Sequence, residues 1–282
     1  MSNEKFVLQE EGSNLDNMAS YWEVLFFSLI GGVFSLVGGA LLLSRQKMAL
    51  NLARYGTPFA AGALLAAALF DLLPESLDLV AGNSATRWVL VGILAFFLLE
   101  HFLKWFHHTH QHEHTGEKSI APLIIIGDTI HNFLDGIAIG AAFLINVPTG
   151  IVAAIAVAAH EIPQEIGDFG LLLKSGYRRK KVLVINGLSA LMSTAGALLT
   201  FWLGSNTSLP LGELLAVTAG FFIYIAASDI IPTLHETKGK LAHLGAALLV
   251  AGVVSVGVVT EVAHEYIDSN HTEIPHPGDE SC

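Results

Sequence analysis

Eight long apolar blocks dominate this chain, and polar residues are largely confined to the short gaps between them. A helix needs roughly 20 consecutive apolar residues to cross the hydrocarbon core of a bilayer. A strand of an outer-membrane barrel would instead alternate apolar and polar residues. The pattern therefore predicts an all-α integral membrane protein with eight transmembrane helices, at 21–43, 57–74, 88–106, 120–144, 147–173, 182–204, 211–231 and 241–263.

Composition and charge strengthen this interpretation. Of the 282 residues, 52% are hydrophobic and 14% are charged, whereas soluble domains have roughly 25% charged residues, so a soluble core is excluded. Most Lys and Arg residues fall in alternate gaps, which the positive-inside rule places in the cytoplasm. We therefore predict extracytoplasmic tails at 1–20 and 267–282 and a transmembrane domain at 21–266, in a plasma membrane or a bacterial inner membrane. The single cysteine, Cys282, allows no internal disulfide.

An internal repeat relates the second and seventh blocks. Segment 61–74, AGALLAAALFDLLP, aligns without gaps to 219–232, AGFFIYIAASDIIP, and both copies contain an Asp and a Pro. Two Ala-rich helices can look alike by composition alone, but Asp and Pro are rare in such helices. Because these two helices run in opposite directions, we predict a 3+2+3 inverted repeat, an arrangement used by secondary transporters. Asp71 and Asp229 are then candidate gate residues on the metal path, or they cap turns.

Blocks four and five each carry a polar stripe. At 100° per residue, the side chains on one side of block four are His131, Asp135, Asp128 and Asn132, and those of block five are His160, Gln164, Asp168 and Glu161, with Glu165 farther round. A charge at bilayer depth costs about 2.5–3.5 kcal/mol, so such clusters indicate function. Imidazole, carboxylate and amide groups are ligands for zinc and similar divalent metals.

We therefore predict a protein that moves divalent metals across the membrane, through a site between helices four and five. The candidate ligands are His131, Asn132, Asp135, His160, Glu161, Gln164 and Glu165. Asp135 and Glu161 carry two negative charges, which one divalent cation would neutralise. Asp128 and Asp168, nearer the cytoplasmic ends, either line an exit path or serve helix packing. A His-rich cytoplasmic loop at 107–118 is predicted to bind zinc weakly in an accessory role through His107, His108, His110, His112 and His114.

The central motifs are HNFLDGIAIGAAF at 131–143 and HEIPQEIGDFGLLLKSG at 160–176, supported by FDLLPES at 70–76 and SDIIPTLHE at 228–236. At these residues the chain resembles the ZIP family of divalent-metal transporters. The resemblance implies the 3+2+3 fold, transport of Zn²⁺ (often with Fe²⁺, Mn²⁺ or Cd²⁺) into the cytoplasm, and usually a homodimer. It also implies metal-site positions at His131, Asn132, Asp135, His160, Glu161 and Gln164. Many relatives have His at the position of Gln164, which leaves open whether one metal binds or two.

Two other classes of protein fit the sequence less well. An intramembrane metalloprotease would use H-E-x-x-H, but here Gln164 replaces the second His, and the L-D-G segment precedes the H-E segment rather than following it. A membrane metal sensor could bind at the surface and would not need two stripes at mid-bilayer. We therefore expect no enzymatic activity, no cofactor apart from the transported metal, and no nucleic-acid partner; the partners expected are divalent metals, the lipid bilayer and a second copy of the chain.

Overall fold

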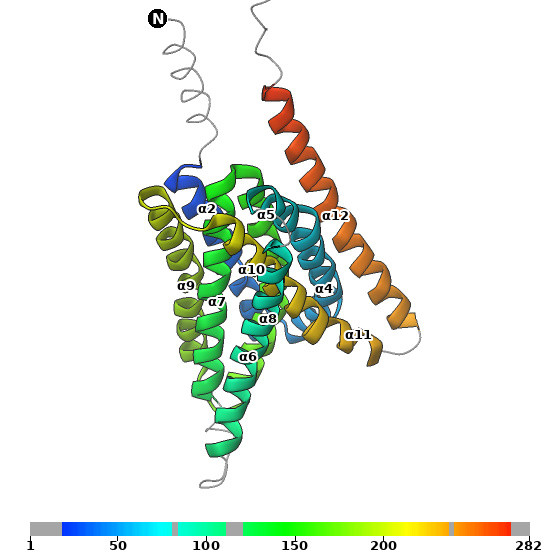
Figure 1. Cartoon of the computed structure of the whole chain (residues 1–282). Coiled ribbons are helices and arrows are strands. Elements are labelled where there is room, and N and C mark those ends of the chain that lie inside the picture. The colour runs from blue at the N-terminus through cyan, green and yellow to red at the C-terminus, as the bar shows by residue number, and fades with distance from the viewer. Residues whose placement is uncertain (1–18, 81–83, 111–120, 237–239, 272–282) are drawn as a thin grey trace, which may run out of the picture.

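The computed structural model describes residues 19–80, 84–110, 121–236 and 240–271, and within these ranges its regular structure is helical. The helices stand side by side in a bundle, with the start of α2 and the end of α12 at the same end (Figure 1). In chain order they are α2 Tyr21–Val33, α3 Leu36–Ser44, α4 Gln46–Ala66, η1 Ala67–Leu72, α5 Leu73–Leu79, α6 Ser84–His110, α7 Ala121–Ile145, α8 Val147–Lys174, α9 Arg179–Asn206, α10 Leu211–Tyr224, η3 Ile225–Ile230, α11 Ile231–Glu236 and α12 Lys240–His271.

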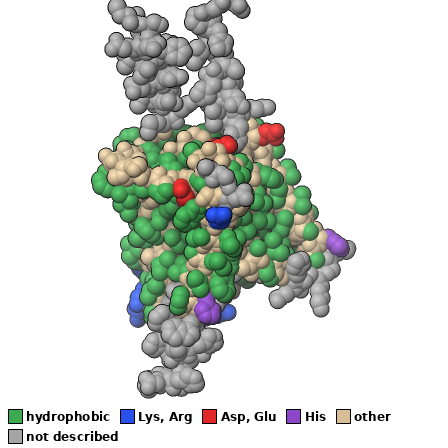
Figure 2. Space-filling view, in the orientation of Figure 1, with side chains coloured by type: hydrophobic (Ala, Val, Ile, Leu, Met, Phe, Trp, Pro, Cys, Tyr) green, Lys and Arg blue, Asp and Glu red, His purple; other side chains and the backbone are tan. Residues whose placement is uncertain are grey.

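Most of these helices, singly or joined end to end, are long enough to span a membrane. Within the described ranges, seven helical stretches are long and apolar enough to cross a membrane. The remaining expected span, α8, has 28 residues and so extends about 42 Å at 1.5 Å per residue; its polar residues lower its hydropathy. Hydrophobic side chains cover most of the face of the bundle in view, and most visible Lys and Arg gather at its lower end (Figure 2). The prediction of an all-α membrane protein is confirmed, while most of both predicted tails lies outside the described residues.

The first span differs from the single helix expected at 21–43. It starts with a capping box, in which Ser20 and Glu23 satisfy each other's backbone N–H groups. The helix is interrupted between Val33 and Leu36. The Ser35 hydroxyl bonds back to the carbonyl of Gly32, and Gly/Ser pairs are a common cause of helix kinks.

The two segments matched by the internal repeat share a local distortion. Each contains a six-residue π-helical turn, η1 in 61–74 and η3 in 219–232, and the two turns fall at equivalent positions of the alignment. α5 lies at the upper end of the bundle and α11 at the lower end, so the two copies run in opposite directions (Figure 1). π-helical turns are rare and are often found at functional sites.

Helix packing also relates the two copies of the internal repeat. Gly62 of α4 packs closely on the backbone of α12 at Leu249, and its repeat counterpart, Gly220 of α10, packs on the backbone of α6 at Val89. Small residues permit such close approach in lipid, where dispersion rather than the hydrophobic effect drives packing. These paired contacts support an inverted repeat, and the full 3+2+3 arrangement stays a prediction.

A second glycine pair, separated by the same number of residues, holds the two central helices. A Cβ on Gly38 of α3 would lie 2.7 Å from the carbonyl oxygen of Ile162 on α8, and one on Gly196 of α9 would lie 2.5 Å from that of Phe133 on α7. α3, in the first span, therefore packs closely on the backbone of α8, and α9, the sixth span, packs on the backbone of α7 at the matched position. Both clamped carbonyls belong to the stretches of α7 and α8 that carry the polar stripes, on the side of each helix away from the stripe.

Candidate functional site

The α7–α8 pair is a tight antiparallel hairpin. α7 ends at Ile145 and α8 starts at Val147, with Asn146 between them. The side-chain oxygen of Asn146 accepts a hydrogen bond of 2.8 Å from the backbone N–H of Thr149 and so caps α8. Because the connection is this short, the stripe on α7 must face the stripe on α8 in a fixed register.

Four of the predicted ligands meet between these helices. His131 and Asp135 extend from α7, His160 and Glu161 extend from α8, and one potential ligand atom from each lies within 4.8 Å of all the others. We call this group the metal centre. His160 Nε2 lies 3.1 Å from Asp135 Oδ2, 3.2 Å from His131 Nε2 and 3.8 Å from Glu161 Oε1. His131 Nε2 lies 3.6 Å from Asp135 Oδ2 and 3.7 Å from Glu161 Oε1.

The imidazole of His160 is held by its own helix. Its Nδ1 lies 3.1 Å from the carbonyl oxygen of Ala156. A carbonyl oxygen can only accept, so Nδ1 donates this hydrogen bond and a neutral ring keeps the lone pair on Nε2. Such a second hydrogen bond is the usual way in which a metal-ligating histidine is oriented. Nε2 therefore points into the metal centre as a donor atom for a metal.

Burial makes the metal centre unstable without a positive partner. Glu161 is fully buried, Asp135 is 4% exposed and His160 is 3% exposed. Neither carboxylate oxygen of Glu161 has a hydrogen-bond partner among the described residues. Burial of an unpaired carboxylate is strongly unfavourable. One divalent cation would neutralise Asp135 and Glu161 together, so the group has the charge and the donor atoms of a divalent-metal site.

The other candidates on these two helices lie outside the group of four. Asn132 is fully buried, and its amide nitrogen donates to Asp128, 2.9 Å from Oδ1 and 3.1 Å from the backbone oxygen. Glu165 is fully buried on α8, and Asp128 is 5% exposed on α7. Gln164 and Asp168 are half-buried on α8.

The remaining candidates are more distant in the chain. Asp71 is buried within η1 and is not part of the metal centre. Asp229 is in η3, but its side chain lies outside the described part of the structure. The same is true of the His107, His108 and His110 side chains at the end of α6, while His112 and His114 lie outside the described residues altogether. Their predicted roles stay predictions.

Sequence reasoning missed the contacts that α6 makes near the metal centre. The ring of Phe96 packs edge-on against His131, with ring centroids 5.4 Å apart. One turn along α6, Glu100 accepts a hydrogen bond of 2.6 Å from the hydroxyl of Tyr224 on α10. Glu100 could have been found, since it is a carboxylate within an apolar span and such residues are usually functional. Phe96 carries no such signal, because phenylalanine is common on any membrane helix.

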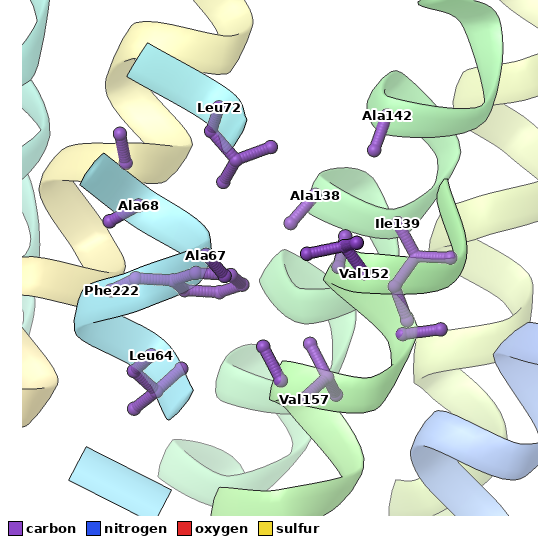
Figure 3. Close-up of a cluster of buried hydrophobic side chains, with 14 of the residues drawn as sticks. Leu64, Ala67, Ala68, Leu72, Ala138, Ile139, Ala142, Val152, Val157 and Phe222 are labelled. Atoms are coloured by element: carbon purple, nitrogen blue, oxygen red, sulfur yellow. The ribbon is translucent and has the colours of Figure 1, made fainter. Parts of the chain in front are cut away.

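The metal centre has an apolar side and a polar side. Beyond Asp135 and His160, toward the α7–α8 connection, buried apolar side chains from four parts of the bundle meet (Figure 3). They are Leu64, Ala67, Ala68, Leu72, Ala138, Ile139, Ala142, Val152, Val157 and Phe222. In the opposite direction along both helices come Asp128, Glu165 and Asp168. Along the hairpin, packed apolar side chains therefore lie in the first direction and carboxylates in the second.

Comparison with known proteins agrees with this geometry. The chain is 48% identical to zinc transporter ZIP10 of Danio rerio over 117 residues, which is 42% of this chain and 14% of that protein. It is 45% identical to zinc transporter ZIP10 of Homo sapiens over 125 residues (44% of this chain, 15% of that protein). It is also 36% identical to zinc transporter ZIP4 of Rattus norvegicus over 149 residues (52% and 22%).

The matched region thus spans less than a quarter of the length of each of these relatives. A family model described as "ZIP Zinc transporter" matches residues 19–122 and 107–260, which together cover most of the chain and include all four residues of the metal centre. With this match across the helical bundle, the chain belongs to the ZIP zinc transporter family.

Proposed function

We propose that this protein carries Zn²⁺ across a membrane into the cytoplasm, and that the ion binds His131, Asp135, His160 and Glu161 on the way. The observation that carries the proposal is the spacing of the donor atoms. A tetrahedral zinc site with bonds of about 2.0–2.1 Å has edges of about 3.3–3.4 Å. The five donor-to-donor distances given above run from 3.1 to 3.8 Å, so the side chains could bind zinc with little rearrangement.

The direction of transport rests on the two sides of the metal centre. The polar side leads along α8 to Lys174 and then to the basic run at 178–181. Loops rich in Lys and Arg are cytoplasmic by the positive-inside rule. The apolar cluster of Figure 3 lies toward the other face. This arrangement suits a conformation that is closed to the outside, and it supports extracytoplasmic termini and release of the ion into the cytoplasm.

The donor set also bears on the choice of metal. Two imidazoles and two carboxylates suit Zn²⁺ and, with less preference, Fe²⁺, Mn²⁺ and Cd²⁺. Gln164 would offer only a neutral amide oxygen, so we propose that it contributes less than a histidine would at that position. Asn132 and Glu165 stay candidates for a neighbouring ion. A homodimer in a plasma or bacterial inner membrane remains our prediction.

The two rival functions fit this geometry less well. A hydrolytic zinc usually keeps one coordination position open for water, whereas four protein donors already surround the metal centre. A sensor would gain nothing from donors buried in a bilayer, where each charge raises the cost of insertion. The closed donor set at bilayer depth therefore favours transport.

Removal of one donor tests the proposal. We expect His131→Ala and Asp135→Ala to abolish ⁶⁵Zn uptake in cells with matched amounts of protein in the membrane, because each removes one of four ligands. His101→Ala is the matched control: this histidine is in a membrane helix but stacks on Phe97 with centroids 5.9 Å apart, away from the metal centre. Undiminished uptake by Asp135→Ala would contradict the proposed site.

A further inference from the structure

Basic side chains from two connections between helices lie together at the lower end of the bundle. α3 passes into α4 at Arg45, and α8 passes into α9 through residues 175–178. The two connections touch, because the guanidinium Nη1 of Arg179 donates a hydrogen bond of 3.4 Å to the backbone carbonyl of Leu43. Most visible Lys and Arg gather at this end (Figure 2). We define the basic corner as the four exposed cations that flank this contact in the chain: Arg45, Lys47, Arg178 and Arg179.

The charge of the basic corner is not neutralised by the described part of the chain. None of its four cations forms an ion pair with a described acidic side chain. Lys174 and Lys180, also exposed, add charge of the same sign. Arg179 uses one of its five N–H groups on Leu43, so the others can bind an anion. Such a concentration of positive charge attracts an anion with several oxygen atoms.

The two cations of the corner that belong to the start of α4 border an open hollow. It has a volume of about 560 Å³ and is lined by Arg45, Gln46, Lys47, Met48 and Asn51. Guanidinium, ammonium and amide groups all donate hydrogen bonds, and Arg and Lys are the usual partners of phosphate in proteins. The positive-inside rule explains why Lys and Arg are frequent in such a connection, but it requires neither the hollow nor the contact with Arg179. Both features suit a site for a phosphate group.

Apolar side chains beside the basic corner indicate which kind of phosphate compound it meets. Residues at i, i+4 and i+7 share one side of a helix, and the outer surface of α4 carries two such stripes next to each other. The polar stripe consists of Lys47, Asn51 and Arg54, all exposed. The apolar stripe consists of Met48, Leu52 and Tyr55, also exposed. A soluble anion would leave the apolar stripe uncovered, whereas a phospholipid offers a phosphate and acyl chains side by side.

The start of α4 lies at the depth of lipid head groups. α4, η1 and α5 form one continuous helical stretch, Gln46–Leu79, of 34 residues, which is about 51 Å long at about 1.5 Å per residue. The hydrocarbon core of a bilayer is about 30 Å thick, so about 20 Å of this stretch remains for the two head-group regions. The first turns of α4, which carry part of the basic corner, therefore lie where the phosphates of phospholipids are found.

We propose that the basic corner binds the phosphate group of an anionic phospholipid whose acyl chains lie along the apolar stripe of α4. The lipid bridges the α3–α4 and α8–α9 connections, because Arg45 and Arg179 come from the two sides of their contact. This site is separate from the metal centre, and the inference does not depend on zinc transport. Anionic lipids attract basic segments next to a membrane, and the hollow gives that attraction a defined place.

The test measures which lipids the purified full chain retains. The protein is placed in nanodiscs with equal amounts of neutral phosphatidylcholine and anionic phosphatidylglycerol that have the same acyl chains, and native mass spectrometry identifies the lipids that stay bound after release. The unaltered chain should retain phosphatidylglycerol in preference. Each Lys or Arg near an anionic lipid surface strengthens binding by about fivefold, so removal of two should lower the preference by about tenfold or more. The two paired variants are Arg45→Gln with Lys47→Gln, and Arg178→Gln with Arg179→Gln.

Arg87→Gln is the matched control, because Arg87 is an exposed cation near the start of α6, toward the opposite end of the bundle; it should leave the preference unchanged. Each paired variant keeps the cations of the other connection, and thermal unfolding in phosphatidylcholine nanodiscs checks that it is folded. Equal retention of the two lipids by the unaltered chain, or an undiminished preference in both paired variants, would overturn the site. Displacement of phosphatidylglycerol by excess inorganic phosphate would also overturn it, since a soluble anion would then suffice.

Discussion

Gly196 offers a sharp test of how the bundle holds its metal ligands. It belongs to α9, contributes nothing to the metal centre and faces the backbone of α7 between His131 and Asp135. A Cβ at this position would lie 2.5 Å from the carbonyl oxygen of Phe133, 3.2 Å from the nitrogen of Ile137 and 3.3 Å from Cα of Gly136. These are backbone atoms, which cannot rotate away as the end of a side chain can.

The size of the effect follows from these distances. Ordinary van der Waals contact begins at 3.4 Å, so Gly196→Ala must separate α7 from α9 by about 0.9 Å at this carbonyl. Overpacking of this kind costs about 1–3 kcal/mol, while alanine in place of glycine within a helix returns about 0.5–1 kcal/mol. We therefore expect a net loss of stability of at most about 2.5 kcal/mol, with about 1 kcal/mol at the middle of the range. Metal–ligand bond lengths in proteins vary by only about 0.2 Å, so a shift of α7 of this size should also disturb the geometry of its ligands.

Thermal unfolding in detergent and ⁶⁵Zn uptake in proteoliposomes would measure the two effects. Changes to groups that orient metal ligands typically cost about 10–100-fold in metal affinity, and we expect a rise in the KM for zinc in that range. Gly187→Ala on the same helix is the matched control: its nearest neighbour, Leu36 Cδ1, would be 3.9 Å away, so it should be neutral or slightly stabilising. Equal stability and equal KM for the two variants would refute the idea that the close contact of Gly196 with Phe133 holds the metal ligands of α7 in place.

Three further outcomes are expected. Zinc uptake should be lost at low pH, because protonated imidazoles and carboxylates do not coordinate metal; uptake that rises steadily below about pH 5, near the reference carboxylate values, would contradict a site made of His and carboxylates. Gln164→His should lower the KM for zinc and strengthen selection of Zn²⁺ over Mn²⁺ in competition assays, since it replaces an amide with an imidazole; an unchanged selectivity would place residue 164 outside the ion path. Replacement of the five loop histidines with Gln should leave most zinc uptake intact, and its complete loss would show that the loop is required rather than accessory.

Helix positions were predictable because hydropathy and length alone determine what can cross a bilayer. The expected block at 147–173 became α8, Val147–Lys174, and the block at 182–204 became α9, Arg179–Asn206. The central stripes were also informative: residues at i and i+4 share a helix face, and two facing stripes must meet somewhere along a short hairpin. The meeting of His131, Asp135, His160 and Glu161 follows from that geometry.

Other features left no signal in the hydropathy pattern. Asn132 lies on the same stripe of α7 as His131 and Asp135, yet its amide nitrogen bonds to Asp128 one turn earlier on the same helix rather than entering the metal centre. The π-helical turns leave no hydropathy signal, since one extra residue in a turn changes the direction of every later side chain without altering composition. The break after Val33 coincides with a hydrogen bond from the Ser35 hydroxyl to the carbonyl of Gly32; both glycine and such side-chain bonds weaken a helix.

The matched π-helical turns have a consequence for protein engineering. Each holds one residue more than an α-helical path would, so deletion of a residue from Ala67–Leu72 would rotate α5 by about 100°. Leu77 and Leu79, now exposed, would then exchange places with residues that are buried. The same deletion in Ile225–Ile230 would turn α11 by the same angle in the opposite half of the bundle. The two segments have equal length and carry their extra residue at the same point. An exchange of 61–74 and 219–232 would therefore leave the direction of the side chains after each turn unchanged, so the two segments are suitable units to swap in chimeric transporters.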